Sequence, residues 1–172
     1  LRPHSVAVLG ASANPARIGG RPIYTIIKDN FQGKLFPVNP NRDIVQGLQA
    51  YPNISSVPVP VDSAVISVPE NVALQVIKEC AESGVKSAVV FTSGFAETGT
   101  AGLDAQQQIA KIASDSGMRI LGPNCLGVFN LSAGWFGTFA NTLASKKIPN
   151  GPIGIVTQSG AYGGHLFTIT QN

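Results

Sequence analysis

The sequence predicts an α/β fold built on an open parallel sheet. Short apolar runs of strand length alternate along the chain with stretches that have helical apolar spacing, and most runs end in Gly, Pro, Asn or Ser. Such βαβ repetition connects parallel strands by right-handed crossovers, which place helices on both faces of the sheet. The 172 residues are enough for one Rossmann-like domain of this kind with a sizeable core.

The first predicted unit is a strand, a glycine-rich turn and a helix. The strand covers Val6 to Gly10, and the helix covers Pro22 to Phe31. Gly10 allows a tight turn, and a helix that opens near Gly20 directs free backbone N–H groups toward an anion above that turn. We therefore expect a cradle for a nucleotide phosphate, although the usual Gly-x-Gly-x-x-Gly spacing is absent.

The second strand, Lys34 to Val38, ends in a neutral-to-basic tip that carries Asn39, Asn41 and Arg42. An NAD-binding domain places an acidic side chain at this point to hold the ribose hydroxyls. The tip therefore favours a ribose with an additional phosphate, as in NADP or CoA. A second interpretation is that Asn39, Pro40 and Asn41 only form a turn, and this segment leaves both open.

Three further strands complete the predicted sheet, and two helices connect them. The strands cover Ser63 to Val68, Ser87 to Thr92 and Arg119 to Gly122. One helix starts at Pro69 and stops at Gly84, and the other covers Gly102 to Ser116. The first of these helices has one apolar face, formed by Ala73, Val76, Ile77, Cys80 and Ala81.

Ligands of open α/β sheets bind outside the carboxyl ends of the strands, where the strand order reverses. The segments with unusual composition all follow predicted strands: Gly10 to Ser12, Val38 to Pro40, Ser67 to Pro69, Thr92 to Phe95, and Gly122 to Cys125. Small and apolar residues at these positions let a ligand lie close to the backbone. We therefore expect a long, thin ligand.

Composition excludes several other classes of protein. Only 12% of residues are charged and the net charge is +3, which predicts a folded chain without a nucleic-acid partner. No apolar stretch approaches the ~20 residues of a membrane span, and Leu1 to Val8 is a predicted strand, so we expect a soluble, cytoplasmic protein with no membrane partner. Cys80 and Cys125 lack metal-type spacing, and we expect neither a disulfide nor a metal site.

The pattern changes near Ala144. Lys146 to Gly151 has the composition of a linker, Pro152 to Thr157 is a predicted strand, and Gln158 to Ala161 opens a second predicted helix. We therefore divide the chain into a domain over residues 1–145 and the first βα unit of a second domain over residues 146–172, and we expect that domain to be truncated.

Taken in order, the motifs resemble the CoA-binding domain of the succinyl-CoA ligase α-subunit and of nucleoside-diphosphate-forming acyl-CoA synthetases. The resemblance extends over essentially the whole chain, and it makes the second unit the start of a flavodoxin-like ligase domain. The motifs that carry it are Gly10-Ala11-Ser12, Val38-Asn39-Pro40, Val61-Asp62 with Val68-Pro69, Ser93 to Glu97, Gly122 to Gly127 and Thr157 to Ala161.

The resemblance implies a CoA site along the strand exits. It places the CoA diphosphate near Gly10, Ala11 and Ser12, the adenosine near Val38, Asn39 and Pro40, the pantetheine across Val68, Pro69, Ser93, Gly94 and Phe95, and the thiol toward Asn124 and Cys125. The family often carries Lys where Asn41 stands, so Arg42 is the nearest cation for the CoA 3′-phosphate.

The helix start at Ser159, Gly160 and Ala161 either receives a phosphate in the complete enzyme or is an ordinary N-cap.

The resemblance also implies the reaction of the parent enzyme. Such ligases form an acyl-CoA thioester from a small carboxylate, CoA and a nucleoside triphosphate, through an acyl phosphate and a phosphohistidine. ATP or ADP and Mg would bind mainly outside this chain, on an ATP-grasp domain or subunit, and we expect an oligomer. The phosphorylated histidine is expected beyond Asn172, so the fragment should bind CoA without catalysing ligation; His165 is expected to be structural.

Two alternative functions and several residue roles stay open. The chain could be the ligase-like regulatory region of a protein lysine acetyltransferase, or an NADP- or nucleotide-sensing module without chemistry. Cys125 is expected to pack rather than to meet the CoA thiol, and Glu97 to be a solvated loop carboxylate. Phe95 could line the pantetheine or plug the core, and Trp135 with Phe136 should pack between the first domain and the linker.

Overall fold

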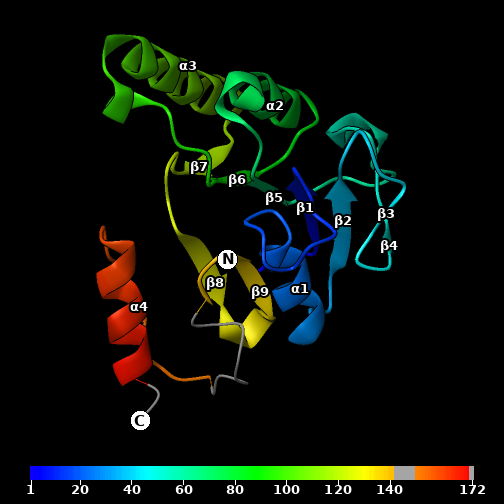
Figure 1. Ribbon diagram of the computed structural model, residues 1–172, viewed down its shortest axis with the longest axis vertical. Helices are drawn as coiled ribbons and strands as arrows, with labels where there is room; N and C mark the ends of the chain where they lie inside the picture. The colour runs from blue at the N-terminus through cyan, green and yellow to red at the C-terminus, as the bar shows by residue number, and fades with distance from the viewer. Residues whose placement is uncertain (142–149, 171–172) are drawn as a thin grey trace.

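A five-stranded parallel sheet forms the centre of the computed structural model, which describes residues 1–141 and 150–170 (Figure 1). Its strands are β1 (Ser5–Leu9), β2 (Lys34–Val38), β5 (Ser63–Ile66), β6 (Ser87–Val90) and β7 (Arg119–Leu121), in the order β2-β1-β5-β6-β7. The chain runs outward from β1 to β2 and then in the other direction from β5 to β7. The strand order therefore reverses between β1 and β5, as the predicted fold class requires.

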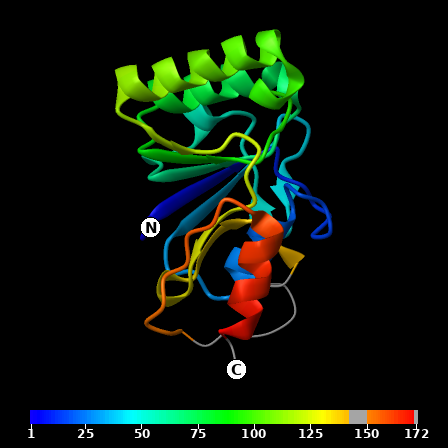
Figure 2. The ribbon, with the colours of Figure 1, turned by 90° about the vertical axis from the view of Figure 1, so that its left-hand side faces the viewer.

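Two long helices cover one face of the sheet. α2 (Glu70–Glu82) and α3 (Thr100–Ser116) lie side by side above the strands in both ribbon views (Figures 1 and 2). α2 presents Ala73, Ile77 and Cys80 to the sheet, and all three are fully buried. Their spacing is that of one helical face, so the sequence pattern identified the packed side of this helix correctly.

The opposite face is covered by a helix and by a β-hairpin that the sequence did not predict. The helix is α1 (Arg21–Lys28), and the hairpin joins β8 (Gly127–Asn130) to β9 (Trp135–Thr138). Trp135 and Phe136 are each only 2% exposed and share a hydrophobic cluster with residues of β1 and α1. These two aromatic residues therefore complete the core on this face of the sheet, and most of the predicted linker against which they were expected to pack lies outside the described residues.

Shorter elements decorate this framework. A second hairpin pairs β3 (Ile44–Val45) with β4 (Leu48–Gln49) through a two-residue turn in which Gln46 and Gly47 both have positive φ. Three single turns of 3₁₀ helix cover Ile54–Ser56, Ala96–Thr98 and Leu131–Ala133. No helix in the described ranges has the length and apolarity needed to cross a membrane.

The C-terminal part differs from the prediction. Residues 152–157 do not form a strand, and Ile153 (69% exposed) and Val156 (fully exposed) have no sheet to pack against. A strand needs a hydrogen-bonding neighbour, and the described chain supplies none for this segment. The predicted helix does form, as α4 (Gly160–Ile169), and its Phe167 contacts Phe129 of β8 at a ring separation of 4.9 Å. Most of the predicted linker over 146–151, and the domain limit at 145, lie outside the described residues.

Candidate ligand-binding site

The exits of all five strands meet at one edge of the sheet, where hydrogen bonds join them. The backbone N–H groups of Gly10 and Ala11 both donate to the carbonyl oxygen of Val38, at 3.1 and 3.2 Å. On the other side of β1, the N–H of Ser67 donates to the carbonyl of Leu9 at 2.9 Å. The exits of β2, β1 and β5 therefore form one continuous surface at the point where the strand order reverses.

Glycine is required where the loop after β1 crosses β5. A Cβ atom on Gly10 would lie 2.2 Å from the carbonyl oxygen of Ser67, and one on Gly19 would lie 2.1 Å from the carbonyl oxygen of Gly10. Gly10 also has a φ of +79°, which disfavours any residue with a side chain. The absence of side chains lets the loop pack directly on the strand exits, as a surface for an extended ligand demands.

The loop uses most of its own backbone donors. The N–H of Ser12 donates to Gly19, that of Asn14 to the hydroxyl of Ser12, and those of Gly20 and Arg21 both to the carbonyl of Arg17. Pro15 and Pro22 have no N–H to offer. Within residues 10–21, only the N–H groups of Ala13, Ile18 and Gly19 have no acceptor among the described residues. The expected set of free donors at the start of α1 is therefore much smaller than the sequence suggested.

A phosphate at this loop would depend on cationic side chains as well as on backbone donors. The side chains of Arg17 and Arg42 are exposed and have no hydrogen-bond or ion-pair partner in the part of the chain that the structure describes. The Arg21 guanidinium, by contrast, donates to the carbonyls of Phe139 and Ala16. The sequence analysis identified Arg42 but missed Arg17, whose position inside the glycine-rich loop was the available signal.

The tip after β2 is held as a turn. The side chain of Asn39 donates to the carbonyl of Ala11 at 2.8 Å and accepts from the N–H of Asn41 at 2.8 Å. Its polar atoms therefore stabilise the two loops, which supports the turn interpretation of this segment. Pro40 and Arg42 remain exposed beside it.

Gln46 is a structural residue of the site that the sequence analysis missed. Its side-chain nitrogen donates to the carbonyls of Ser12 (2.9 Å) and Gly20 (2.8 Å), so the β3–β4 turn holds both ends of the loop after β1. The pair Gln46-Gly47 between Ile44-Val45 and Leu48 was the sequence signal for this hairpin.

The exits of β5, β6 and β7 are joined in the same way. The hydroxyl of Thr92 donates to the carbonyl of Val68, and the N–H of Asn124 donates to the carbonyl of Thr92 at 3.0 Å. Asn124 has a φ of +54°, and its side chain donates to the carboxylate of Glu97. Glu97 is exposed, as expected, but it is also an acceptor that connects two loops.

Cys125 and Phe95 have structural surroundings. The Cys125 sulfur lies 3.4 Å from the carbonyl oxygen of Val90, and burial raises the pKa of this thiol. A raised pKa suppresses the reactive thiolate, which supports the packing role that we expected. Phe95 is 1% exposed and lies in the core, so it plugs the core instead of forming a wall.

The predicted site residues differ in what they can offer a ligand. Ala11, Val38 and Phe95 are buried, so only their backbone atoms can contribute. Gly10, Ser12, Asn39, Val68, Gly94 and Cys125 are half-buried, and Pro40, Arg42, Pro69, Ser93 and Asn124 are exposed.

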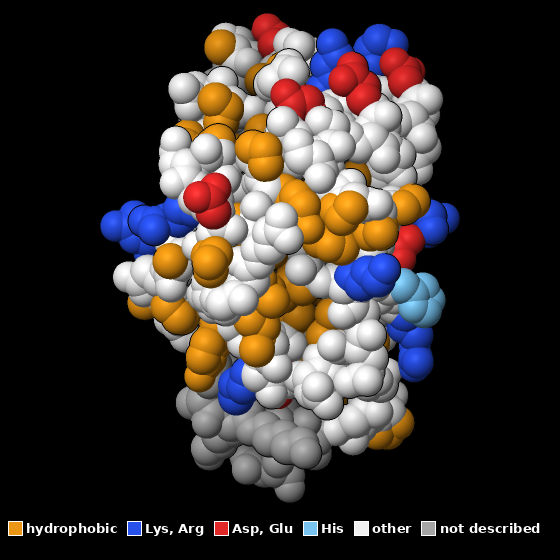
Figure 3. Space-filling view, turned by 90° about the vertical axis from the view of Figure 1, so that its right-hand side faces the viewer, with side chains coloured by type: hydrophobic (Ala, Val, Ile, Leu, Met, Phe, Trp, Pro, Cys, Tyr) orange, Lys and Arg blue, Asp and Glu red, His pale blue; other side chains and the backbone are white. Residues whose placement is uncertain are grey.

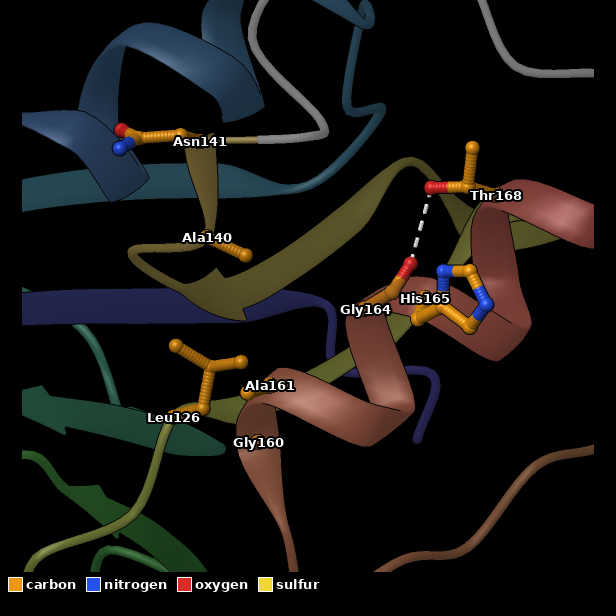
Figure 4. A pocket seen from close by; sticks show the side chains of 8 residues that line it. All are labelled: Leu126, Ala140, Asn141, Gly160, Ala161, Gly164, His165 and Thr168. Carbon is orange, nitrogen blue, oxygen red and sulfur yellow. Dashed lines mark hydrogen bonds between the residues drawn. The ribbon is translucent and has the colours of Figure 1, made fainter.

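A separate pocket of about 470 Å³ lies between α4 and the segments that flank β8 and β9 (Figure 4). Its lining is mainly small or apolar and comprises Leu126, Ala140, Asn141, Gly160, Ala161, Gly164, His165 and Thr168. At the start of α4 the hydroxyl of Ser159 accepts the N–H of Tyr162 at 3.3 Å, which is an N-cap. His165 lines this pocket but is exposed, and it does not belong to any of the strand exits.

Charge is dispersed on the face that Figure 3 shows. Lys and Arg side chains lie in several parts of this face, and those at the top have Asp and Glu side chains beside them.

Comparison with known proteins gives a consistent set of relatives. A profile of the CoA binding domain family matches residues 4–130. An ADP-forming acetate–CoA ligase II from Archaeoglobus fulgidus is 40% identical over 99% of this chain and 25% of its own length. The α-subunit of the corresponding ligase from Pyrococcus furiosus is 40% identical over 95% of this chain and 34% of its own length. The chain thus spans a quarter to a third of these curated relatives.

Two solved structures share the architecture. A protein from Pyrococcus horikoshii superposes with a TM-score of 0.89 and 34% identity, over 99% of this chain and 38% of the other. The dinucleotide forming acetyl-coenzyme A synthetase 1 of Ca. Korarchaeum cryptofilum superposes with a TM-score of 0.82 and 38% identity, over 99% of this chain and 36% of the other. The same synthetase is known in complex with phosphate and ADP.

Proposed function

The chain belongs to the CoA binding domain family, in the form found in ADP-forming acyl-CoA ligases, and from this premise we propose that the strand-exit edge binds CoA. The observation that carries the proposal is the contact between the glycine loop and β5 at the reversal of strand order. There Gly10 and Gly19 pack without side chains against Ser67 and against each other, so no side chain at these two positions would stand between the strand exits and a long ligand.

The CoA molecule would extend along this edge from β2 to β7. Its diphosphate would lie at the loop of residues 10–20. Positive charge would come from Arg17 and from the N–H groups of Ala13, Ile18 and Gly19, which have no acceptor among the described residues. Arg42 at the β2 tip is the cation for the 3′-phosphate. The pantetheine would cross Val68 and Pro69 toward Ser93 and Gly94, and the thiol would approach Asn124.

The parent protein is proposed to be an ADP-forming acyl-CoA ligase. Relatives include ligases named for acetate and for 4-hydroxybutyrate and a trans-feruloyl-CoA synthase, so the domain is shared by enzymes with different carboxylates. We therefore propose that residues outside the CoA edge select the acyl group.

The same proposal has four further parts. The parent would react through an acyl phosphate and a phosphohistidine, would work with an ATP-grasp domain or subunit, and would be an oligomer. The start of α4 at Ser159, Gly160 and Ala161 would bind a phosphate.

Calorimetric titration of the chain with CoA, dephospho-CoA, NADP and NAD tests the proposal. We expect CoA to bind most tightly and dephospho-CoA to bind more weakly, because the latter lacks the 3′-phosphate that Arg42 would contact. Binding of NADP without binding of CoA would contradict the proposal, and so would the absence of any CoA binding.

A further inference from the structure

Glu97 makes an unusual set of contacts for an exposed carboxylate. Its Oε1 atom accepts the backbone N–H of Gly94 at 2.8 Å and the side-chain amide of Asn124 at 3.1 Å. These donors belong to two loops, one after β6 and one after β7. The hydrogen bonds, that of Gly94 first, lower the pKa of the Glu97 carboxyl, so the carboxylate form persists at neutral pH and below.

The Glu97–Asn124 contact is the one hydrogen bond between residues 93–97 and 122–125 within the described ranges. Two further bonds at these loops do not involve Glu97. The hydroxyl of Thr98 donates to the carbonyl of Phe95, and the N–H of Asn124 donates to the carbonyl of Thr92. Removal of the Glu97 carboxylate would leave the backbone bond between Asn124 and Thr92 at the base of the two loops, but it would remove the bonds that hold Gly94 and the Asn124 side chain.

Backbone conformation on both sides shows that the contact is closely specified. Gly94 has a φ of +106°, and a Cβ atom there would lie 2.6 Å from the Cγ atom of Glu70. Asn124 has a φ of +54°. Both donors thus reach the carboxylate from left-handed backbone positions, which few residue types adopt readily.

We propose that Glu97 is a positioning residue for the pantetheine end of CoA, because its carboxylate fixes the loop that contains Ser93 and Gly94 relative to the loop that contains Asn124. The inference rests on the proposed CoA site. It assigns Glu97 no contact with the ligand and no part in the chemistry. It also separates this end of the site from the nucleotide end, which other residues hold.

The test compares CoA with 3′-phospho-ADP, which has the nucleotide end and lacks pantetheine. We expect E97A to weaken CoA binding about tenfold, the effect of one or two lost hydrogen bonds to a charged group, and to leave 3′-phospho-ADP binding unchanged. E97Q retains an acceptor oxygen and should lose only about two- to threefold. E82Q, at an exposed glutamate paired with Lys78 on α2, is the matched control for loss of charge.

Asn124 supplies the second arm of the test. N124A should weaken CoA binding without affecting 3′-phospho-ADP, and the double variant E97A/N124A should be no weaker than the more impaired single variant by more than about twofold. Because the CoA thiol is itself proposed to approach Asn124, the coupling between Glu97 and Asn124, and not the N124A loss alone, tests the inference. If E97A folds poorly, E97Q takes its place in the double variant.

Each outcome has a distinct meaning. If the unaltered chain binds neither ligand, the proposed CoA site itself is wrong. If it binds both ligands, but E97A and N124A lose both equally, Glu97 has only a general structural role. Unchanged CoA affinity in E97A would overturn the inference directly.

Discussion

The carbonyl oxygen of Ser67 lies 2.2 Å from the position that a Cβ atom on Gly10 would occupy. The loop after β1 can therefore contact β5 only while residue 10 has no side chain. Because β1 and β5 flank the point where strand order reverses, this contact shapes the centre of the proposed CoA edge.

Substitution G10A should reduce stability more than a positive φ alone explains. The strained backbone costs about 1–2 kcal/mol, and the collision with Ser67 adds to it. G84A is the matched control, since Gly84 also has a positive φ but no atom within 4 Å of the added Cβ. Denaturant unfolding of both variants measures the difference, and equal losses would show that the contact with Ser67 relaxes without cost.

Substitution Q46A should weaken CoA and 3′-phospho-ADP alike. The Gln46 side chain holds the carbonyls of Ser12 and Gly20, so its loss loosens the loop where both ligands place their diphosphate. We expect a loss of about three- to tenfold for each ligand by calorimetry. Q49A, at an exposed position on β4, is the control. A loss confined to CoA would contradict this division of the site.

Substitution of Arg17 and substitution of Arg42 should affect the binding of CoA and dephospho-CoA differently. R42A should reduce the preference for CoA over dephospho-CoA, because only CoA has the 3′-phosphate. R17A should weaken both ligands and lower the salt dependence of binding, because each carries the diphosphate. R119A, at an exposed position on β7, is the control. Identical behaviour of R17A and R42A toward dephospho-CoA would count against the assignment.

Asp62 should contribute stability that disappears in acid. The Lys86 side chain, 2.7 Å away, and the N–H of His4 lower the pKa of this carboxyl from its ordinary value of 3.8. A lowered folded-state pKa stabilises the fold fully above about pH 4, and the contribution is lost as the pH falls through the folded-state pKa. D62N should cost about 1–2 kcal/mol at pH 7.

Unfolding free energies of the D62N variant and the unaltered chain should converge as the pH falls below about 4. D115N removes one carboxylate from an exposed ion pair on α3 and serves as the control at each pH. A pH-independent difference between D62N and the unaltered chain would rule out the ionic explanation.

Cys125 should react slowly with an alkylating reagent in the folded protein, whereas Cys80 should react only after unfolding. Burial raises the pKa of the Cys80 thiol to about 12, and it raises the pKa of Cys125 as well. We expect slow labelling of Cys125 that accelerates with pH, and labelling of Cys80 only after unfolding. Mass spectrometry of the labelled peptides distinguishes them, and rapid labelling of Cys125 at neutral pH would contradict its packed role.

The repeated pattern of strands and helices was accessible from the sequence because each element carries its own signal. The apolar spacing of Ala73, Ile77 and Cys80 marked the packed face of α2 directly. The β8–β9 hairpin escaped because its short strands contain glycine and are joined by a 3₁₀ turn rather than a two-residue turn. The unpaired segment 152–157 was assigned to a strand because its composition is that of a strand, but pairing depends on a neighbour that no local pattern reveals.

The position of the candidate site at the strand exits could be predicted, because it follows from the topology of the sheet. Strand exits of a parallel sheet share one edge, so the glycine loop and the segment containing Asn124 could be brought together without coordinates. The contacts of Gln46 with Ser12 and of Glu97 with Asn124 span 34 and 27 residues and depend on positive φ values. Patterns in a single sequence do not reveal such long-range contacts. They also did not reveal that the carbonyl of Arg17 accepts the N–H groups of Gly20 and Arg21, which are then not free for a ligand.

Trp135 extends the core of the domain beyond the residues that the family profile matches. The family profile ends at residue 130, yet the indole of Trp135 and the ring of Phe136 belong to the core that α1 and β1 share. A fragment that ends at residue 130 would lose Trp135 and Phe136 and would expose to water the face of the sheet that they cover. It would still contain all the residues of the proposed ligand edge. The β8–β9 hairpin therefore stabilises the fold that presents the binding edge, although the hairpin itself lies outside the proposed CoA contacts.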